Sequence, residues 1–504
     1  MKKCIAVSLF SMACTLAVCA HAAEPNPATQ RWWSHVQALA NDGMRGRDTG
    51  SAEHRRAQEY VARQLEKQGL QPAGERGFFQ SVPLHAYRLR IDRSRAELET
   101  ASKAQRLRWL RDITVTPALG LPNTVSGRLI FAGSDNAANI DTTGAIVVRL
   151  TPPRLVLGPP VPPPPIGAVA ILGVDSIEGP EPSRWPAQNA VSMALAETGI
   201  AKLEGAPTLR INPKSADKLF AGSGHRYQEL LQLAASGKPL PSFALNGKLK
   251  LRMEFDAREL RSDNVVAILP GADPRLASQH IVLSAHIDGY GIGTPWGKDR
   301  IYNGAFDDAA YVATLLDFVA QLKSSGTKLR RSLLLTSFTG EEKGLLGSRY
   351  YAQHLTVPRE RLVANVNLDQ LRPIFPLHTL TMHAVDDTTL GATARIIAAE
   401  MNIRIQSDPE PLRNLVRRSD NFPFMQLGVP ATGFIFGYAP GSSDEAIYRR
   451  WYQDRYHTPL DDLEQPWDPE AAAKFNEFFA RFVTALANAD DAPRWNAGSA
   501  YAPR

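Results

Sequence analysis

Cysteine is scarce in this sequence of 504 residues, which holds only Cys4, Cys14 and Cys19. All three lie in a segment typical of a secretory signal, with two early lysines, an apolar run and an Ala-x-Ala stretch. We therefore expect residues 1–22 to be removed and the exported protein, periplasmic or secreted, to contain no cysteine. This composition excludes structural disulfides, thiolate metal sites and a cysteine nucleophile.

The chain also lacks a strong excess of one charge and an apolar run of membrane-spanning length. Its formal net charge is +6, and no cluster of Lys or Arg forms a track for nucleic acid. The apolar part of the signal falls short of the roughly 20 residues that span a bilayer. Lipidation of Cys19 is disfavoured because Val18 is bulky for that position. We expect no nucleic-acid partner and no stable membrane association after signal cleavage, and the oligomeric state stays open.

Several catalytic motifs are missing as well. The sequence has no Gly-x-Ser-x-Gly elbow, no His-Glu-x-x-His helix and no P-loop lysine. The glycines at 289–293 follow a predicted strand but do not complete a dinucleotide-binding fingerprint. These absences exclude the commonest serine-hydrolase, single-zinc protease and nucleotide-binding signatures.

The length predicts two or three domains, and a change in composition divides the chain. Eight of the fourteen residues at 152–165 are proline, which neither a helix nor a central strand tolerates. We interpret 110–255 as a separate β-rich domain in which 152–165 is a rigid surface connection, with partner docking as the alternative. Residues 23–109 and 256–504 would form the N-terminal part and the main part of a second domain.

Strands and helices alternate from residue 264 onwards, which indicates an α/β domain with a mixed, largely parallel sheet flanked by helices. Ligands of such sheets bind beyond the carboxyl ends of the strands. The predicted strands cover 281–285, 332–338, 363–368 and 429–436, and the predicted helices cover 51–70, 307–322, 342–354, 388–401 and 469–487.

Residues that can bind metal follow these strands and occupy nearby loops. They are His286, Asp288, Asp307, Asp308, Glu341, Glu342, Asp369 and His457. Each has an ordinary explanation when taken alone, such as a helix cap, a charged first turn or a hydrogen-bonded loop histidine. Burying so many unpaired polar groups at one sheet edge is costly, however, and a bound cation would compensate them. The pattern therefore favours a metal site.

The sequence resembles the co-catalytic zinc aminopeptidases, a family that also includes glutamate carboxypeptidases and glutaminyl cyclases. Its middle part resembles the protease-associated domain inserted in many members. The fold implied is that of zinc exopeptidases with this inserted domain. The motifs that carry the resemblance, in order, are Asp42–Gly50, Ser262–Gly271, Ser284–Asp288, Gly304–Ala309, Thr339–Glu342, Asn367–Asp369 and Tyr456–Pro459.

The resemblance implies two Zn²⁺ ions per chain. Asp307 would bridge them, with His286 and Asp369 completing one site and Glu342 and His457 the other. Each ion would then have three protein ligands, as catalytic zinc commonly does. The same residues could also accept manganese or cobalt, because their donor atoms are all oxygen and nitrogen.

The resemblance also assigns the catalytic groups. Glu341 would act as general base on a zinc-bridging hydroxide, and Asp288 would orient the imidazole of His286. Asp308 is the alternative to Asp307 as the bridging ligand. Otherwise Asp308, with Glu341, could hold the free ammonium of a substrate.

Three positions depart from the family pattern. Phe306 stands where many members have Asp, and Gly289 and Asn421 stand where His is common. None removes a proposed ligand. We expect these residues to contact the pocket wall and therefore to alter substrate preference.

The function implied is that of a metallo-exopeptidase, an aminopeptidase that hydrolyses the N-terminal residue of peptides. A carboxypeptidase is the first alternative, for which Arg413, Arg417 and Arg418 would supply a cation for the C-terminal carboxylate. Glutaminyl cyclase and a non-catalytic binding protein are further alternatives. The side-chain preference at the cleaved residue is not defined by the sequence.

Overall fold

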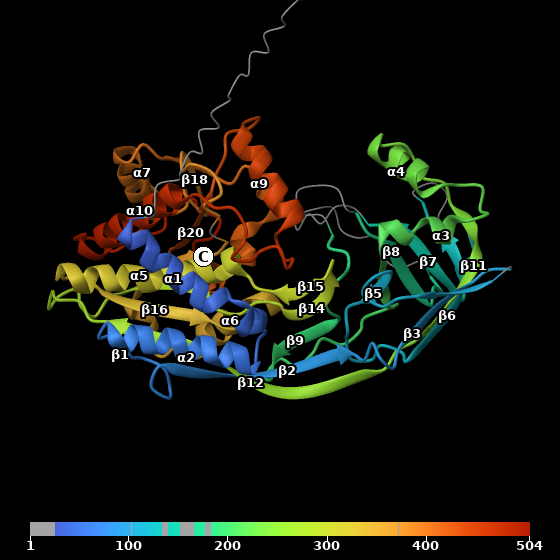
Figure 1. The fold of residues 1–504 in the computed structure, drawn as a ribbon, viewed down its shortest axis with the longest axis horizontal. Helices are drawn as coiled ribbons and strands as arrows, with labels where there is room; N and C mark the ends of the chain where they lie inside the picture. The colour runs from blue at the N-terminus through green and yellow to red at the C-terminus, as the bar shows by residue number, and fades with distance from the viewer. Residues whose placement is uncertain are drawn as a thin grey trace, which may run out of the picture.

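The computed structural model describes residues 26–101, 103–133, 140–151, 166–176, 183–370 and 372–503. Two β-rich lobes lie side by side and are joined by long strands (Figure 1). The predicted signal at 1–22 and the proline-rich segment at 152–165 lie outside the described residues.

The larger lobe is built on a mixed sheet of ten strands. Its four central strands run parallel, while the pairs β12–β16 and β18–β20 on either side are antiparallel. The mixed sheet that the sequence predicts is therefore confirmed. In spatial order the strands are β19 (Arg404–Gln406), β18 (Thr379–Met382), β20 (Ala431–Phe436), β17 (Leu362–Leu368), β13 (His280–His286), β16 (Ser332–Phe338), β12 (Phe255–Leu269), β2 (Phe79–Leu89) and β9 (Val191–Leu195), with β1 (Gln71–Pro72) beside β12.

Helices cover both faces of this sheet, which is why its central strands are continuous apolar runs. Along β13, Ile281 and Leu283 pack into one hydrophobic core and Val282 packs into the other. The first core includes α1 (Pro27–Ala40), α2 (Ala52–Lys67), α5 (Ala310–Ser325), α7 (Leu390–Glu400), α9 (Ser443–Asp454) and α10 (Pro469–Asn488). The second includes α6 (Leu346–Gln353) and α8 (Asn421–Gln426).

Two predicted helices begin later than the sequence suggests. The helix predicted at 307–322 begins at Ala310, because Asp307 and Asp308 have non-helical backbone angles. The helix predicted at 342–354 begins at Leu346, after a short turn at 341–343 and a left-handed Gly344. In both places the chain that precedes the helix is irregular, and it carries residues predicted to bind metal.

The smaller lobe contains an eight-stranded sheet with its own hydrophobic core. Two of its strands, β3 and β4, precede residue 110, where the sequence analysis begins the second domain. In spatial order the strands are β4 (Ala104–Leu107), β3 (Arg95–Glu99), β11 (Phe243–Arg252), β6 (Thr124–Phe131), β7 (Ala145–Leu150), β8 (Ala170–Val174), β10 (Thr208–Ile211) and β5 (Ile113–Val115). The short helices α3 (Asp217–Phe220) and α4 (Tyr227–Ala235) pack against it.

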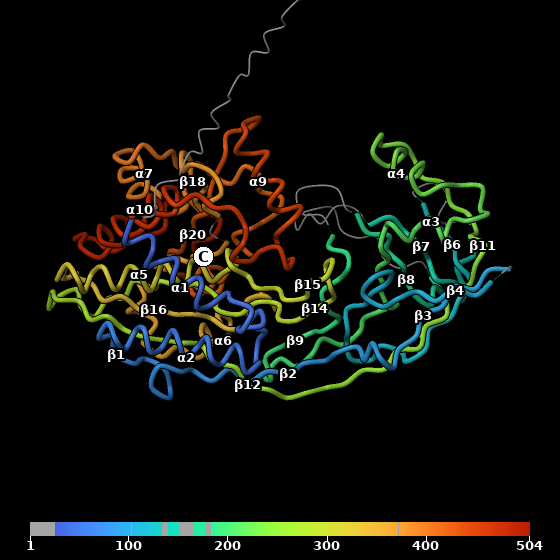
Figure 2. Tube along the Cα trace, viewed as in Figure 1, coloured from blue at the N-terminus to red at the C-terminus, as the bar shows by residue number. Residues whose placement is uncertain are grey.

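The two lobes share secondary structure. Strands β2 and β12 pair over eleven positions, from Phe79 opposite Val265 to Leu89 opposite Phe255. Strand β9 lies between β8 and β10 in the sequence, yet it pairs with β2 at the edge of the larger sheet (Figure 2). A hairpin of β14 (Gly291–Trp296) and β15 (Asp299–Tyr302) follows β13.

The described helices include none with both the length and the apolar character needed to cross a membrane.

Candidate metal centre

Three neighbouring parallel strands end at the same edge of the larger sheet. His286 is the last residue of β13, Asp369 directly follows β17, and Glu341 lies three residues beyond the end of β16. Because β13 lies between β17 and β16, these side chains converge. The strand-end rule, by which ligands bind beyond the carboxyl ends of parallel strands, therefore located this cluster from the sequence.

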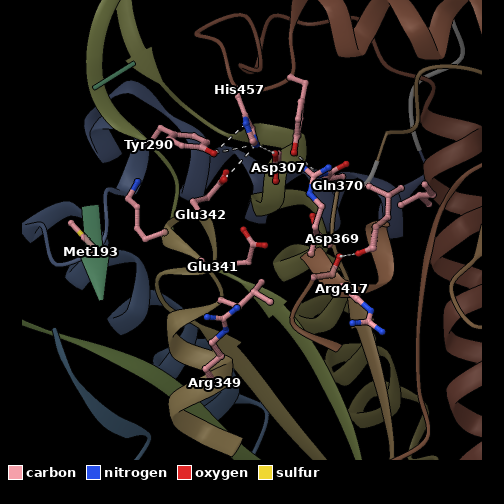
Figure 3. A pocket seen from close by; sticks show the side chains of 18 of the residues that line it. Met193, Tyr290, Asp307, Glu341, Glu342, Arg349, Asp369, Gln370, Arg417 and His457 are labelled. Carbon is pink, nitrogen blue, oxygen red and sulfur yellow. Dashed lines mark hydrogen bonds and ion pairs between the residues drawn. The ribbon is translucent and has the colours of Figure 1, made fainter. Parts of the chain in front are cut away.

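Asp307 lies at the centre of the cluster. Its Oδ1 is 3.2 Å from His286 Nε2, and its Oδ2 is 3.2 Å from His457 Nε2. The imidazole of His286 is also 4.0 Å from Asp369 Oδ1, and that of His457 is 3.4 Å from Glu342 Oε2. Figure 3 shows Asp307, Glu342 and His457 converging from different segments.

Among the described residues, three groups of donor atoms could hold a metal ion: one joins His286, Glu341 and Glu342, and the other two are overlapping triads that share Asp307. The first triad contains His286, Asp307 and Asp369, and the second contains Asp307, Glu342 and His457, with all ligand atoms of each triad within 4.8 Å of one another. Asp307 belongs to both. The structure thus brings together the five residues that the resemblance implies as ligands, and their role as ligands stays a prediction.

Asp308 has different surroundings from Asp307, to which it is joined by a cis peptide bond. Its carboxylate is fully buried and accepts a hydrogen bond from the backbone N–H of His286, 3.2 Å away. Asp308 is part of neither triad and does not line the adjoining cavity. The suggestion that Asp308 holds a substrate ammonium is therefore wrong, because no substrate can reach it.

Glu341 points into the space beside the two triads, with Oε2 4.0 Å from His286 Nε2 (Figure 3). Its backbone N–H donates to Asp288 Oδ1 at 3.0 Å, and Thr49 Oγ1 donates to Asp288 Oδ2 at 3.0 Å. The Nδ1 of His286 lies 3.2 Å from the backbone oxygen of Asp288 and 3.8 Å from its carboxylate. Asp288 thus contacts both the His286 imidazole and the backbone of Glu341.

The cluster holds more negative charge than its own groups can neutralise. Glu342 Oε1 and Asp369 Oδ1 are buried and receive no hydrogen bond from the described residues. Burial raises the pKa of Glu341 and Glu342 well above the usual range, and that of Asp369 to about 6, with neighbouring carboxylates adding to each shift. Four acids around two imidazoles, with oxygens left without donors, fit a site for divalent cations that favour oxygen and nitrogen ligands.

The loop that carries His457 is held in an uncommon conformation. His457 has φ of 57°, in the left-handed region that costs a residue other than glycine about 1 kcal/mol or more. Its backbone oxygen accepts from Gln188 Nε2 at 2.8 Å, and its Nδ1 lies 3.1 Å from the hydroxyl of Tyr290. The ring of Tyr456 stacks on its imidazole, with centroids 3.6 Å apart. These contacts fix the direction of the imidazole.

Two buried residues that support the cluster were missed by the sequence analysis. The guanidinium of Arg47 donates to the backbone oxygens of Leu39, Ile287, Asn303 and Gly304. Arg47 thereby ties together segments beside His286 and Asp307. Its only sequence signal is a place in the motif Asp42–Gly50.

Asp461 is the second missed residue. Its two carboxylate oxygens accept the backbone N–H groups of Phe306 and Asp307 at 2.9 and 3.1 Å. Burial raises the pKa of Asp461 to about 7. Its position four residues after His457 in a loop was the available signal.

A cavity of about 520 Å³ opens beside the cluster. Arg417 and Arg418 line it, whereas Arg413 is 1% exposed and is paired with Glu410 instead. The three basic residues therefore do not form one cluster. The cavity is large enough for a small ligand.

The three departures from the family pattern lie outside this cavity. Phe306 and Asn421 are completely buried, and Gly289 packs against the backbone of Gly46. None of them lines the cavity. The expectation that Phe306 and Asn421 contact the pocket wall is therefore wrong, because both face the protein interior, whereas Gly289 lines a smaller pocket with Asp307, Glu342 and His457.

Comparisons with known proteins give a family match and several relatives. Residues 264–483 match the model of peptidase family M28. The chain is 24% identical over 208 residues to leupeptin-inactivating enzyme 1 of Streptomyces exfoliatus, covering 40% of this chain and 43% of that protein. It spans less than half the length of the first curated relatives that it matches.

Solved structures share the fold over nearly the whole chain. An aminopeptidase from Aneurinibacillus sp. strain AM-1 has a TM-score of 0.58 at 18% identity, covering 94% of this chain and 96% of that one. BSAP, a zinc aminopeptidase from Bacillus subtilis, has a TM-score of 0.57 at 17% identity, covering 92% and 96%. The segment that matches the model of peptidase family M28 contains every residue of both triads.

Proposed function

We propose that this protein is a zinc-dependent aminopeptidase that hydrolyses the N-terminal peptide bond of peptide substrates. The observation that carries the proposal is the position of Asp307, whose two oxygens face His286 and His457 at 3.2 Å each. A carboxylate shared in this way supports a pair of metal ions. The family match and the aminopeptidases among the related structures support the same activity.

Two zinc ions would be held by the two triads, with Asp307 shared between them. Bound zinc would lower the pKa of water and polarise the carbonyl of the bond to be cleaved. The buried oxygens of Glu342 and Asp369 that lack hydrogen-bond donors support these ligand roles.

Glu341 is the proposed proton carrier. Its side chain is 11% exposed, lines the cavity and belongs to neither of the two triads. It would take a proton from the attacking water and deliver it to the amine that leaves. Asp288, which accepts the backbone N–H of Glu341, would keep this residue in place.

A carboxypeptidase is the second candidate, because Arg417 and Arg418 line the same cavity. An aminopeptidase requires a free N-terminal amine on its substrate, whereas a carboxypeptidase also accepts N-acetylated peptides. Release of free amino acids from matched unblocked and N-acetylated peptides therefore separates the two.

The test combines this substrate panel with metal analysis of the purified full chain. We expect close to two zinc ions per chain, cleavage of unblocked peptides only, and loss of cleavage on chelation. Glu341→Gln is expected to lower kcat by at least about a hundredfold while zinc is retained. Glu360→Gln changes an exposed glutamate and is the matched control. Full activity of Glu341→Gln would refute the assigned role.

We also propose that residues 1–22 direct export and that the smaller lobe is a protease-associated domain. N-terminal sequencing of the protein recovered from the periplasm or medium tests the first point, with Ala23 as the expected first residue.

A further inference from the structure

The charges that line the cavity are distributed unevenly. Besides the carboxylates of the two triads and Glu341, the charged side chains that line it are all cations: Lys343, Arg349, Arg417 and Arg418. Arg349 and Arg417 are exposed and form no ion pair with the described residues. Figure 3 shows both on the side of Glu341 that faces away from His457 and Tyr290. This part of the cavity therefore attracts anions.

His383 adds a buried polar group to the same cavity. It lines the cavity, is 4% exposed, and neither ring nitrogen has a hydrogen-bond partner among the described residues. A buried polar group without a partner is costly and rare in proteins. The ring nitrogens of His383 are thus available to a ligand.

The backbone holds this imidazole in place. The N–H of His383 donates to Gly433 on β20 at 2.9 Å, and Thr432 Oγ1 donates to its carbonyl at 2.7 Å. A Cβ at position 433 would lie 3.2 Å from His383 Nδ1. The absence of a side chain at Gly433 therefore leaves room for the ring, and Ile435, two residues along β20, lines the cavity beside it.

Burial and the nearby charge of Arg413 lower the pKa of His383 to about 4. The imidazole is therefore neutral at pH 7 and presents one N–H donor. Such a donor, in a cavity that Arg349 and Arg417 also line, suits an oxygen acceptor that carries negative charge.

We propose that His383, together with Arg417 and Arg349, binds a free carboxylate of the substrate, which is not part of the peptide bond that is cleaved. This inference rests on the proposed aminopeptidase function. Peptides offer two sources of that carboxylate: the side chain of an N-terminal Glu or Asp, and the C-terminus of a dipeptide. The recognition chemistry is the same for both.

The test measures kcat/KM of the zinc-loaded full chain in two substrate series. The first compares L-glutamyl, L-aspartyl, L-glutaminyl and L-leucyl p-nitroanilides. The second compares dipeptides with free and with amidated C-termini, and includes N-acetylated dipeptides. Calorimetric binding of L-glutamate, L-glutamine and L-leucine provides a readout that does not depend on turnover.

The variants are His383→Leu, Arg417→Gln and Arg349→Gln, with the exposed Arg450→Gln as a matched control outside the cavity. For the wild type we expect a kcat/KM ratio of about tenfold or more, either between the glutamyl and the glutaminyl substrate or between the free and the amidated dipeptides. The three cavity variants should each lower that ratio about tenfold, and Arg450→Gln should not. The variants at exposed positions 417 and 349 test the proposal even if His383→Leu fails to fold.

The outcomes separate the possibilities. A preference for glutamyl or aspartyl substrates identifies the side chain as the source, and a preference for free dipeptide termini identifies the C-terminus. Cleavage of unblocked peptides with neither preference overturns this inference and leaves the proposed function intact. Cleavage of N-acetylated dipeptides, or binding of glutamate without any turnover, overturns the aminopeptidase proposal. Either result supports the carboxylate site if the cleavage or the binding is lost in Arg417→Gln.

Discussion

Removal of the guanidinium of Arg47 should destabilise the larger lobe strongly. Arg47 is completely buried and donates four hydrogen bonds, all of them to backbone oxygens. Arg47→Met keeps much of the side-chain volume and removes every donor. The carbonyls of Leu39, Ile287 and Asn303 would then lie buried without their present partner, whereas that of Gly304 still accepts from the backbone N–H of Ala309 at 3.3 Å.

The magnitude follows from the three carbonyls that lose their donor. A buried acceptor that loses its donor costs about 1–3 kcal/mol. Relief of the desolvation of the guanidinium acts in the opposite direction, so the low end of that range applies. Three acceptors left without a donor, at about 1 kcal/mol each, give a loss of about 3 kcal/mol in the free energy of unfolding. Arg47→Lys should lose about 2 kcal/mol, because one ammonium cannot reach carbonyls on several sides.

The assay is unfolding by urea, monitored by circular dichroism. A chelator is present throughout, so that bound metal does not contribute to stability. Arg56→Met is the matched control, since Arg56 has a half-exposed side chain and donates to a single backbone oxygen, that of Gly43. We expect the control to change the free energy of unfolding by less than about 1 kcal/mol. A loss for Arg47→Met that is no larger than for Arg56→Met would refute this account of Arg47.

Two further predictions concern buried groups outside the two triads: His54, whose Nε2 lies 2.9 Å from Thr339 Oγ1, and Asp461. Burial lowers the pKa of His54 to about 4, so the unfolded chain takes up its proton first and stability falls as pH drops from 6.5 to about 4. With chelator present between pH 7 and 4, the free energy of unfolding of His54→Gln should fall less steeply with decreasing pH than that of the wild type, by up to about 1.4 kcal/mol per pH unit. A slope equal to that of the wild type would contradict this account of His54. Asp461→Asn should weaken zinc binding about tenfold in competition with a fluorescent chelator, because an amide cannot accept both backbone N–H groups. An affinity equal to that of Asp462→Asn would contradict that role.

The sequence predicted the centre because its residues follow a local rule. His286 and Asp369 stand where buried strands end, and these strands can be recognised in the sequence as short apolar runs. Because neighbouring strands run parallel, their carboxyl ends lie at the same edge of the sheet, and the residues that follow them are therefore close together. The largely apolar run of β16 likewise explains why this strand was predicted at the bounds found in the structure.

Residues that act through the backbone at long range were not predictable in this way. Arg47 contacts carbonyls 240 to 257 residues away, and Asp461 contacts amides 155 and 154 residues away. Nothing in the local pattern of either differs from an ordinary surface arginine or turn aspartate. His383 follows the short strand β18, which the sequence analysis did not identify, so the strand-end rule was not applied to it.

The pairing of Leu89 with Phe255 has a consequence for how the smaller lobe is attached. The chain leaves the larger sheet and returns to it at directly opposite residues, so a two-residue turn could close the β2–β12 hairpin without changing its register. Excision of the whole intervening segment would nevertheless remove β9, which covers the outer edge of β2 and supplies Val191 and Met193 to the cavity wall. The smaller lobe is therefore removable as a matter of chain topology, yet its loss would leave the larger sheet with a bare edge and the cavity open on one side.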